Sequence, residues 1–148
     1  MTDTTMTDTA RITIARRFDA PRERVFAAWT DPAQFAHWFG TAATTVTDVR
    51  MDARVDGAWS ARMLLPDGTE IPWHGTYRKI DPPGQLALTL TDQPEDDDEP
   101  LTVEFTEVDG GTLMTFRQYG NHMDDAGYAQ AEQGWRGFFD DLDALVTA

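Results

Sequence analysis

The chain has 148 residues, and its 26 acidic against 12 basic side chains give a formal net charge of −14 at pH 7. No cysteine is present, which excludes disulfide bonds, thiolate nucleophiles and cysteine-bound metals. Because so negative a surface repels phosphate backbones and anionic lipids, we expect neither nucleic acid nor membrane as a partner.

The first ten residues differ in composition from the rest of the chain. Residues 1–10 contain neither Lys nor Arg and no apolar run, so they lack the features of a signal peptide. We expect them to form a disordered leader before a single domain over residues 11–148. No later stretch is apolar and long enough to span a bilayer, and we expect a cytoplasmic protein.

The domain is expected to begin with a strand and two short helices. Apolar residues alternate over residues 11–19, as in a strand with one buried face. Pro21 suits the first turn of a helix, and a second short helix is expected from Pro32 to a stop at Gly40. The apolar side chains of these segments are Ile12, Ile14, Phe18, Val25, Phe26, Trp29, Phe35, Trp38 and Phe39.

Strands and tight turns fill the middle of the chain. The turns carry Asp, Gly and Pro, as at Asp56-Gly57, so neighbouring strands should pair antiparallel. An acidic stretch over residues 92–100 lacks the ligand spacing and central glycine of a calcium loop, and we expect a solvated, mobile hairpin loop there. Six strands are predicted, over residues 46–54, 58–65, 71–80, 85–91, 101–108 and 112–119.

A long helix is expected at the end of the chain. Apolar residues recur at helical spacing from Tyr128 to Val146, and Asp124 and Asp125 favour the helix N-terminus. The sequence therefore predicts an α+β fold, in which a seven-stranded, curved antiparallel sheet wraps around a long C-terminal helix, with two short helices after the first strand. A gap between sheet and helix is the expected place for a ligand.

Several segments are similar to those of a known family. They are ITIARRFDAPRERVFAAWTDPAQFAHWFG at 12–40, DGAW at 56–59, PDG at 66–68, HGTYRKIDPPGQL at 74–86, GGT at 110–112 and GW at 134–135. Together they resemble the activator of heat-shock-protein-90 ATPase homologue-like family, within the SRPBCC (START / Bet v 1-like) superfamily. The resemblance implies the helix-grip fold.

The resemblance also implies a range of functions. Members of the superfamily bind lipids, hormones and polyketides, some act as cyclases or aromatases, and some sequester reactive natural products. The co-chaperone that gives the family its name carries a further N-terminal domain. This chain lacks that domain, so we do not expect a chaperone partner.

Alternation along the strands predicts which side chains line the cavity. Each aromatic residue taken singly is typical of ordinary core packing, but as a group Trp and Met side chains offer polarizable walls to a flat apolar ligand. Gly75, inside a strand, either leaves room for a ligand or lets the sheet bend around the helix. The predicted ligand-binding residues are Trp38, Phe39, Trp59, Met63, Trp73, Tyr77, Met114, Phe116, Tyr128, Trp135 and Phe138.

Few residues indicate catalysis. The single serine, Ser60, is not in a G-x-S-x-G motif, and the three histidines do not have metal-ligand spacing. We therefore expect neither a metal nor a cofactor. Glu132, at the margin of the helix's apolar stripe, is a candidate acid–base residue together with Tyr77, although a surface position for Glu132 is the simpler interpretation.

Three functions are compatible with these features. We expect a protein that binds a small hydrophobic ligand, of unknown identity, without converting it. The alternatives are a cyclase- or hydratase-type enzyme acting on an apolar, polyketide-like substrate, and a co-chaperone-like regulator of a heat-shock ATPase. The sequence is equally compatible with a monomer and with a homodimer.

Overall fold

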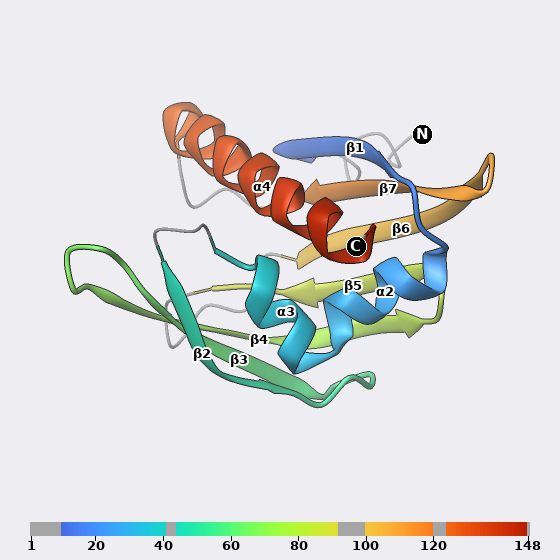
Figure 1. Cartoon of the computed structure of the whole chain (residues 1–148). Helices are drawn as coiled ribbons and strands as arrows, with labels where there is room; N and C mark the ends of the chain where they lie inside the picture. Colours follow the sequence, from blue (N-terminus) through green and yellow to red (C-terminus); the bar gives the residue numbers. More distant parts are fainter. Residues whose placement is uncertain (1–9, 41–43, 92–99, 120–123, 148) are drawn as a thin grey trace, which may run out of the picture.

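The computed structural model describes residues 10–40, 44–91, 100–119 and 124–147. A strand, two short helices, six strands and a long helix follow one another in the predicted order (Figure 1). The predicted leader, apart from Ala10, and residues 92–99 of the acidic loop lie outside the described residues. The elements are β1 (Ile12–Phe18), α2 (Arg22–Thr30), α3 (Pro32–Trp38), β2 (Thr45–Met51), β3 (Ala58–Leu64), β4 (Glu70–Asp81), β5 (Gln85–Thr89), β6 (Pro100–Val108), β7 (Gly111–Gln118) and α4 (Asp125–Val146).

The seven strands form one sheet in the order β1-β7-β6-β5-β4-β3-β2, and all neighbouring strands are antiparallel. Two of the turns need backbone angles that glycine adopts at no steric cost: φ is 91° at Gly68, between β3 and β4, and 79° at Gly110, between β6 and β7. The fold is therefore the predicted α+β helix-grip arrangement, with a curved antiparallel sheet and a long C-terminal helix.

Helix α4 is the longest helix of the described residues and has one buried, apolar face. The Asp124 side chain accepts a hydrogen bond from the Gly127 backbone nitrogen at 2.8 Å and so caps the helix at its beginning. Trp135 and Leu142 are buried, and the Trp135 ring lies 4.6 Å from the ring of Phe116 on β7, whereas Phe138 is only half-buried. Helix α4 lies against β1, α2 and α3, and α3 in turn lies against β2 (Figure 1).

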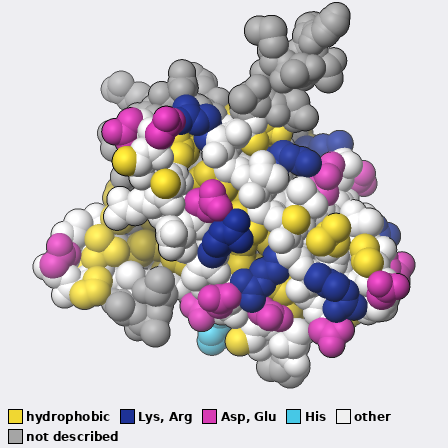
Figure 2. All heavy atoms as spheres, turned by 90° about the horizontal axis from the view of Figure 1, so that it is seen from above, with side chains coloured by type: hydrophobic (Ala, Val, Ile, Leu, Met, Phe, Trp, Pro, Cys, Tyr) yellow, Lys and Arg dark blue, Asp and Glu magenta, His cyan; other side chains and the backbone are white. Residues whose placement is uncertain are grey.

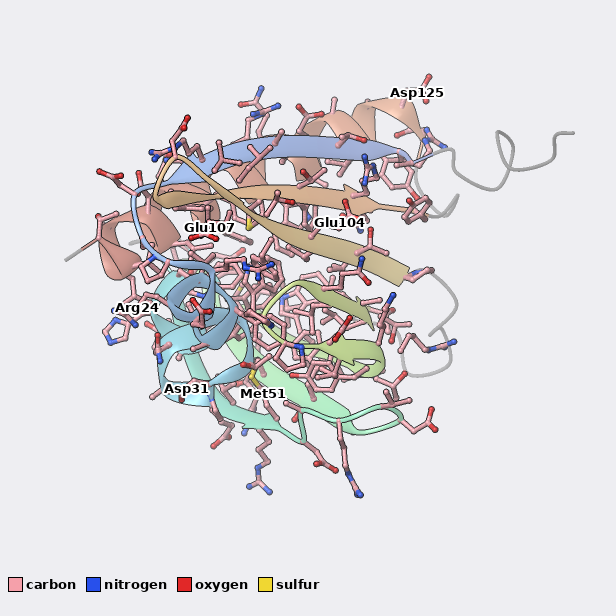
Figure 3. All side chains as sticks on the ribbon, turned by 90° about the vertical axis from the view of Figure 1, so that its right-hand side faces the viewer. Arg24, Asp31, Met51, Glu104, Glu107 and Asp125 are labelled. Carbon is pink, nitrogen blue, oxygen red and sulfur yellow. The ribbon has the colours of Figure 1, made fainter. Side chains whose placement is uncertain are left out.

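Arginine side chains tie α4 to the elements beside it. Arg16 of β1 forms an ion pair with Asp140 at 2.6 Å. Arg24 of α2 donates a hydrogen bond to the carbonyl oxygen of Leu145 at 2.9 Å, near the end of α4 where carbonyl groups lack helical partners. Figure 3 labels Arg24 on α2. From above, acidic and basic side chains lie side by side over much of this face (Figure 2). These contacts set the position of the helix over one side of the sheet.

A close contact across β4 explains why residue 75 is glycine. The Trp59 indole nitrogen on β3 donates to the carbonyl oxygen of Thr89 on β5 at 2.8 Å, although β4 lies between these two strands. A Cβ atom on Gly75 would lie 1.9 Å from that carbonyl oxygen and 2.7 Å from the indole nitrogen. Gly75 therefore leaves no room for a ligand. Its hydrogen side chain permits a close backbone approach, which corrects the first of the two interpretations above.

The same contact shortens β5. The predicted strand runs to residue 91, but β5 ends at Thr89, because the Thr89 carbonyl bonds to Trp59 and the Thr89 hydroxyl accepts from the backbone nitrogen of Thr76 at 2.9 Å. Pairing resumes only as an isolated bridge between His74 and Thr91. Within the described ranges, no helix has both the length and the apolar character needed to cross a membrane.

Candidate ligand-binding site

Aromatic rings from both layers of the fold meet in the interior. Trp29 of α2 lies 4.7 Å from Trp38 of α3, and Phe116 of β7 lies 4.6 Å from Trp135 of α4, measured between ring centroids. Successive contacts of this kind join one set of rings, which we call the aromatic cluster. Its members are Trp29, Phe35, Trp38, Phe39, Trp59, Trp73, Phe116, Trp135, Phe138 and Phe139.

Phe39 connects the sheet to α4 within this cluster. Its ring lies 6.1 Å from Trp59 and 6.1 Å from Trp73 on the sheet, and 6.1 Å from Trp135 and 5.6 Å from Phe138 on the helix. Phe39 follows directly on α3, whose contacts with α4 and β2 place it between the two layers. The residue is buried, so the space between sheet and helix narrows here to a packed aromatic contact.

Beyond Phe39 the apolar interior reaches solvent. We call four half-buried residues on this side the open rim: Val46, Ile71, Trp73 and Phe138. Val46 and Ile71 both pair with Met63 across the sheet and share its inward face. Seen from above, apolar side chains gather at the left of the molecule, where the β3–β4 hairpin projects past α4 (Figures 1 and 2).

The five tryptophans differ in what their indole nitrogens bond to. The Nε1 atoms of Trp38, Trp59 and Trp135 donate to the Ala28 carbonyl, the Thr89 carbonyl and the Gln118 side-chain oxygen, at 2.8, 2.8 and 2.9 Å. The Nε1 atoms of Trp29 and Trp73 and the hydroxyl of Tyr77 are buried and have no hydrogen-bond partner among the described residues. Buried polar atoms are normally hydrogen-bonded, so each of these three atoms could still form a hydrogen bond with a bound molecule.

Tyr77 lies on the inward face of β4, opposite Leu88 of β5. Burial raises the pKa of its hydroxyl above the ordinary value of 10.0, and the negative charge of Asp52 adds to the rise. The phenol therefore stays protonated at neutral pH. It is able to donate a hydrogen bond but not to act as a base.

Comparison with known proteins places the chain in a family. The family described as "Activator of Hsp90 ATPase homolog 1-like protein" matches residues 19–147. The chain belongs to this family. A solved structure of a protein from Chromobacterium violaceum is 27% identical, with a TM-score of 0.82 over 93% of this chain and 97% of that chain. An AHSA1-like protein from Aeromonas hydrophila is 25% identical, with a TM-score of 0.76 over 92% of each chain. No curated protein sequence matches significantly.

Most of the predicted cavity residues of this family member come together in space. Seven of the eleven belong to the aromatic cluster: Trp38, Phe39, Trp59, Trp73, Phe116, Trp135 and Phe138. Met63 lies beside them under the rim, and Met114 is buried on β7. Tyr128 lies two turns before Trp135, at the beginning of α4, where the Arg11 guanidinium covers its ring at 4.3 Å.

Sequence reasoning did not assign Trp29, Phe35 and Phe139 to the site. All three lie at apolar positions with helical spacing, and that spacing is a usable signal. What the spacing lacks is the angle at which each helix crosses the sheet. That angle brings the Trp29 ring within 6.4 Å of Trp135 and 6.2 Å of Phe139.

The predicted acid–base pair of Glu132 and Tyr77 is not assembled. The Glu132 carboxylate accepts hydrogen bonds from Arg136, one turn further along α4, at 2.8 and 3.2 Å. The Tyr77 hydroxyl has no partner. Glu132 is therefore a partly exposed residue in an i,i+4 ion pair, as in its simpler interpretation. Among the described residues, no group of three or more His, Asp or Glu side chains would hold a metal ion.

A hollow of about 410 Å³ lies elsewhere, over the central strands β4 to β7. Lys79, Ala87, Thr102 and Arg117 form one cross-strand row in it, and its depth comes from two short side chains lying between two long ones. This row alternates with the buried residues of the same strands, so the hollow lies on the outer face of the sheet. Its charged and polar lining does not suit an apolar ligand.

Proposed function

We propose that this protein binds a small apolar ligand between the inner face of the sheet and α4. The observation that carries the proposal is the open rim. The rings of Trp73 and Phe138 contact Phe39, yet both residues are only half-buried, unlike the buried rings around them. A ligand seated there would cover the rim and lie against the aromatic cluster.

The chemistry of the rim fits a flat, apolar molecule. Aromatic and branched aliphatic side chains supply the walls, and rings prefer offset or edge-to-face contacts with one another. Covering about 300 Å² of apolar surface is worth about 7 kcal/mol at 25 cal/mol per Å², before the cost of ordering the ligand. Since about 8 kcal/mol corresponds to micromolar binding, and the ordering cost lowers the area value further, we expect dissociation constants of roughly 10–100 μM.

Binding without conversion fits the site better than catalysis. Among the described residues the buried polar side chains are Thr89, Thr112 and Gln118, together with the phenol of Tyr77, and none of these is an acid or base at neutral pH. A cyclase or hydratase needs a titratable group placed to move a proton. Glu132, the candidate for that role, is engaged with Arg136.

A titration with N-phenyl-1-naphthylamine, a neutral apolar fluorophore, tests the proposal. Ile71→Asp places a charge on the open rim and should weaken binding by at least about tenfold, because a buried charge without a partner is unfavourable. Leu64→Asp is the matched control, since Leu64 is 45% exposed and lies one register position away on the outer face. Equal affinities of the two variants, or no binding by the unmodified protein, would contradict the proposal.

A further inference from the structure

The unpartnered polar atoms of the interior share one property, which is that each is a hydrogen-bond donor. An indole N–H donates and cannot accept, and a phenol donates readily. The atoms are the Nε1 of Trp29, the Nε1 of Trp73 and the hydroxyl of Tyr77. A ligand that places a hydrogen-bond acceptor next to one of these donors gains binding free energy, whereas a purely apolar ligand leaves the desolvated donor unpaired.

The side-chain oxygens of Thr89, Thr112 and Gln118, by contrast, already have partners. Thr89 accepts from the Thr76 backbone nitrogen, Thr112 donates to the Ala20 carbonyl, and the Gln118 oxygen accepts from Trp135. A ligand donor would therefore have to displace an existing bond. The interior favours acceptors over donors.

The interior also disfavours a charged group on the ligand. No Asp, Glu, Lys, Arg or His among the described residues is buried. A carboxylate on the ligand would lose its hydration without meeting a cation, and an ammonium group would lose its hydration without meeting a carboxylate. The interior is therefore suited to a neutral molecule.

Of the three unpartnered donors, Trp73 is the one that belongs to the open rim. Its ring is half-exposed on the open rim and lies 6.1 Å from Phe39, whereas Trp29 is buried among other rings. Its Nε1 atom is nevertheless shielded from solvent and has no partner. Trp59 on the neighbouring strand differs from Trp73, because its Nε1 atom donates a hydrogen bond to the Thr89 carbonyl oxygen within the protein.

We propose that the ligand is a neutral apolar compound that carries a carbonyl acceptor, such as an aromatic ketone. Trp73 Nε1 donates a hydrogen bond to that carbonyl oxygen. This inference rests on the proposed binding function. Trp73 thereby sets the specificity of the site. The bond fixes which end of the ligand faces the open rim, and the aromatic cluster contacts the remainder.

Four probes of one shape test the ligand class by isothermal titration calorimetry. They are 2-acetylnaphthalene, the hydrocarbon 2-isopropylnaphthalene, 2-naphthoate and protonated 2-naphthylmethylamine. The ketone should bind about 3- to 10-fold more tightly than the hydrocarbon, as expected of one net hydrogen bond. The anion and the cation should bind at least about tenfold more weakly than the ketone. Tighter binding of either charged probe would overturn the inference.

Replacement of single donors tests the assignment to Trp73. Trp73→Phe keeps an aromatic ring but removes the N–H, and should bring the affinity ratio of ketone to hydrocarbon close to one. Trp29→Phe and Tyr77→Phe should retain the preference for the ketone. Loss of the preference in either of these two variants, with its retention in Trp73→Phe, would overturn the assignment. If Trp73→Phe does not fold, the NMR signal of the Trp73 indole proton in the unmodified protein provides the test. That signal should move downfield with the ketone but not with the hydrocarbon. An equal shift with both probes would overturn the assignment to Trp73.

The two proposals fail in different ways. If none of the four probes binds, the proposed function fails. If ketone and hydrocarbon bind equally well, binding stands and the carbonyl inference fails.

Discussion

The Trp59 indole nitrogen on β3 reaches the Thr89 carbonyl on β5 at 2.8 Å, across the strand that lies between them. The bond is possible because residue 75 of β4 has no side chain at the crossing point. It satisfies one buried indole, ends β5 and turns the Thr89 hydroxyl toward the Thr76 nitrogen. One glycine thus determines the local pairing of three strands beside the aromatic cluster.

Gly75→Ala is therefore expected to destabilise the fold strongly. The new Cβ would lie 1.9 Å from the Thr89 carbonyl oxygen, and backbone atoms cannot move away as a flexible side chain could. Overpacking typically costs about 1–3 kcal/mol, and we expect at least the upper end of that range in urea unfolding. Gly137→Ala in α4 is the control, because its Cβ would meet nothing within 4 Å. It should stabilise the helix by about 0.5–1 kcal/mol.

A second prediction concerns the bond between Trp135 and Gln118. Gln118→Leu removes the acceptor and leaves the Trp135 N–H buried without a partner, which should cost about 1–3 kcal/mol of unfolding free energy. Adding Trp135→Phe removes the unpaired donor, so the double variant should be less destabilised than the sum of the two single changes. Strict additivity in chemical denaturation would show that the bond is not formed.

The exposed ion pair between Glu132 and Arg136 should contribute much less to stability than the buried bond between Trp135 and Gln118. Glu132→Gln removes the pair with Arg136 on the outer side of α4, and should change the unfolding free energy by no more than about 0.5 kcal/mol. A loss of more than about 2 kcal/mol would indicate that Glu132 has a role in the interior after all.

Much of the fold follows from local patterns. Alternation and turn residues place β1, β3 and β6 to within one residue at each end, and helical spacing places Trp135 and Leu142 on the buried face of α4. The end of β5 could not be predicted in this way. It depends on Trp59, which is 30 residues away in sequence and two strands away in the sheet.

The pH dependence of stability provides a fourth prediction. Burial raises the pKa of Tyr77 in the folded state above 10.0, so the unfolded chain loses this proton first. The folded state then holds more protons, and the contribution of Tyr77 to stability is full below pH 10 and falls as pH rises above it. Urea unfolding between pH 8 and 11.5 should show a steeper loss for the unmodified protein than for Tyr77→Phe, by up to about 1.4 kcal/mol per pH unit. Parallel curves would contradict a buried phenol.

The candidate site was predictable in composition but not in its polar chemistry. Aromatic residues on inward faces could be read from the sequence, and seven of them form part of the cluster. The sequence does not show which indole nitrogens have hydrogen-bond partners, because Trp38, Trp59 and Trp135 find acceptors only through the packing of separate elements. The ion pair of Glu132 with Arg136 could not be predicted for a related reason, because a residue at the margin of an apolar stripe can turn toward either side.

The central claim is that the interior beside Trp73 accepts an apolar ligand, and the five indole N–H signals of the protein report on it directly. A ¹⁵N–¹H correlation spectrum recorded during titration with N-phenyl-1-naphthylamine should show the Trp73 signal moving most, because its ring lies on the open rim. The movement should saturate with the same dissociation constant as the fluorescence of the probe. If the probe binds and all five indole signals stay in place, the ligand lies elsewhere and the account is wrong.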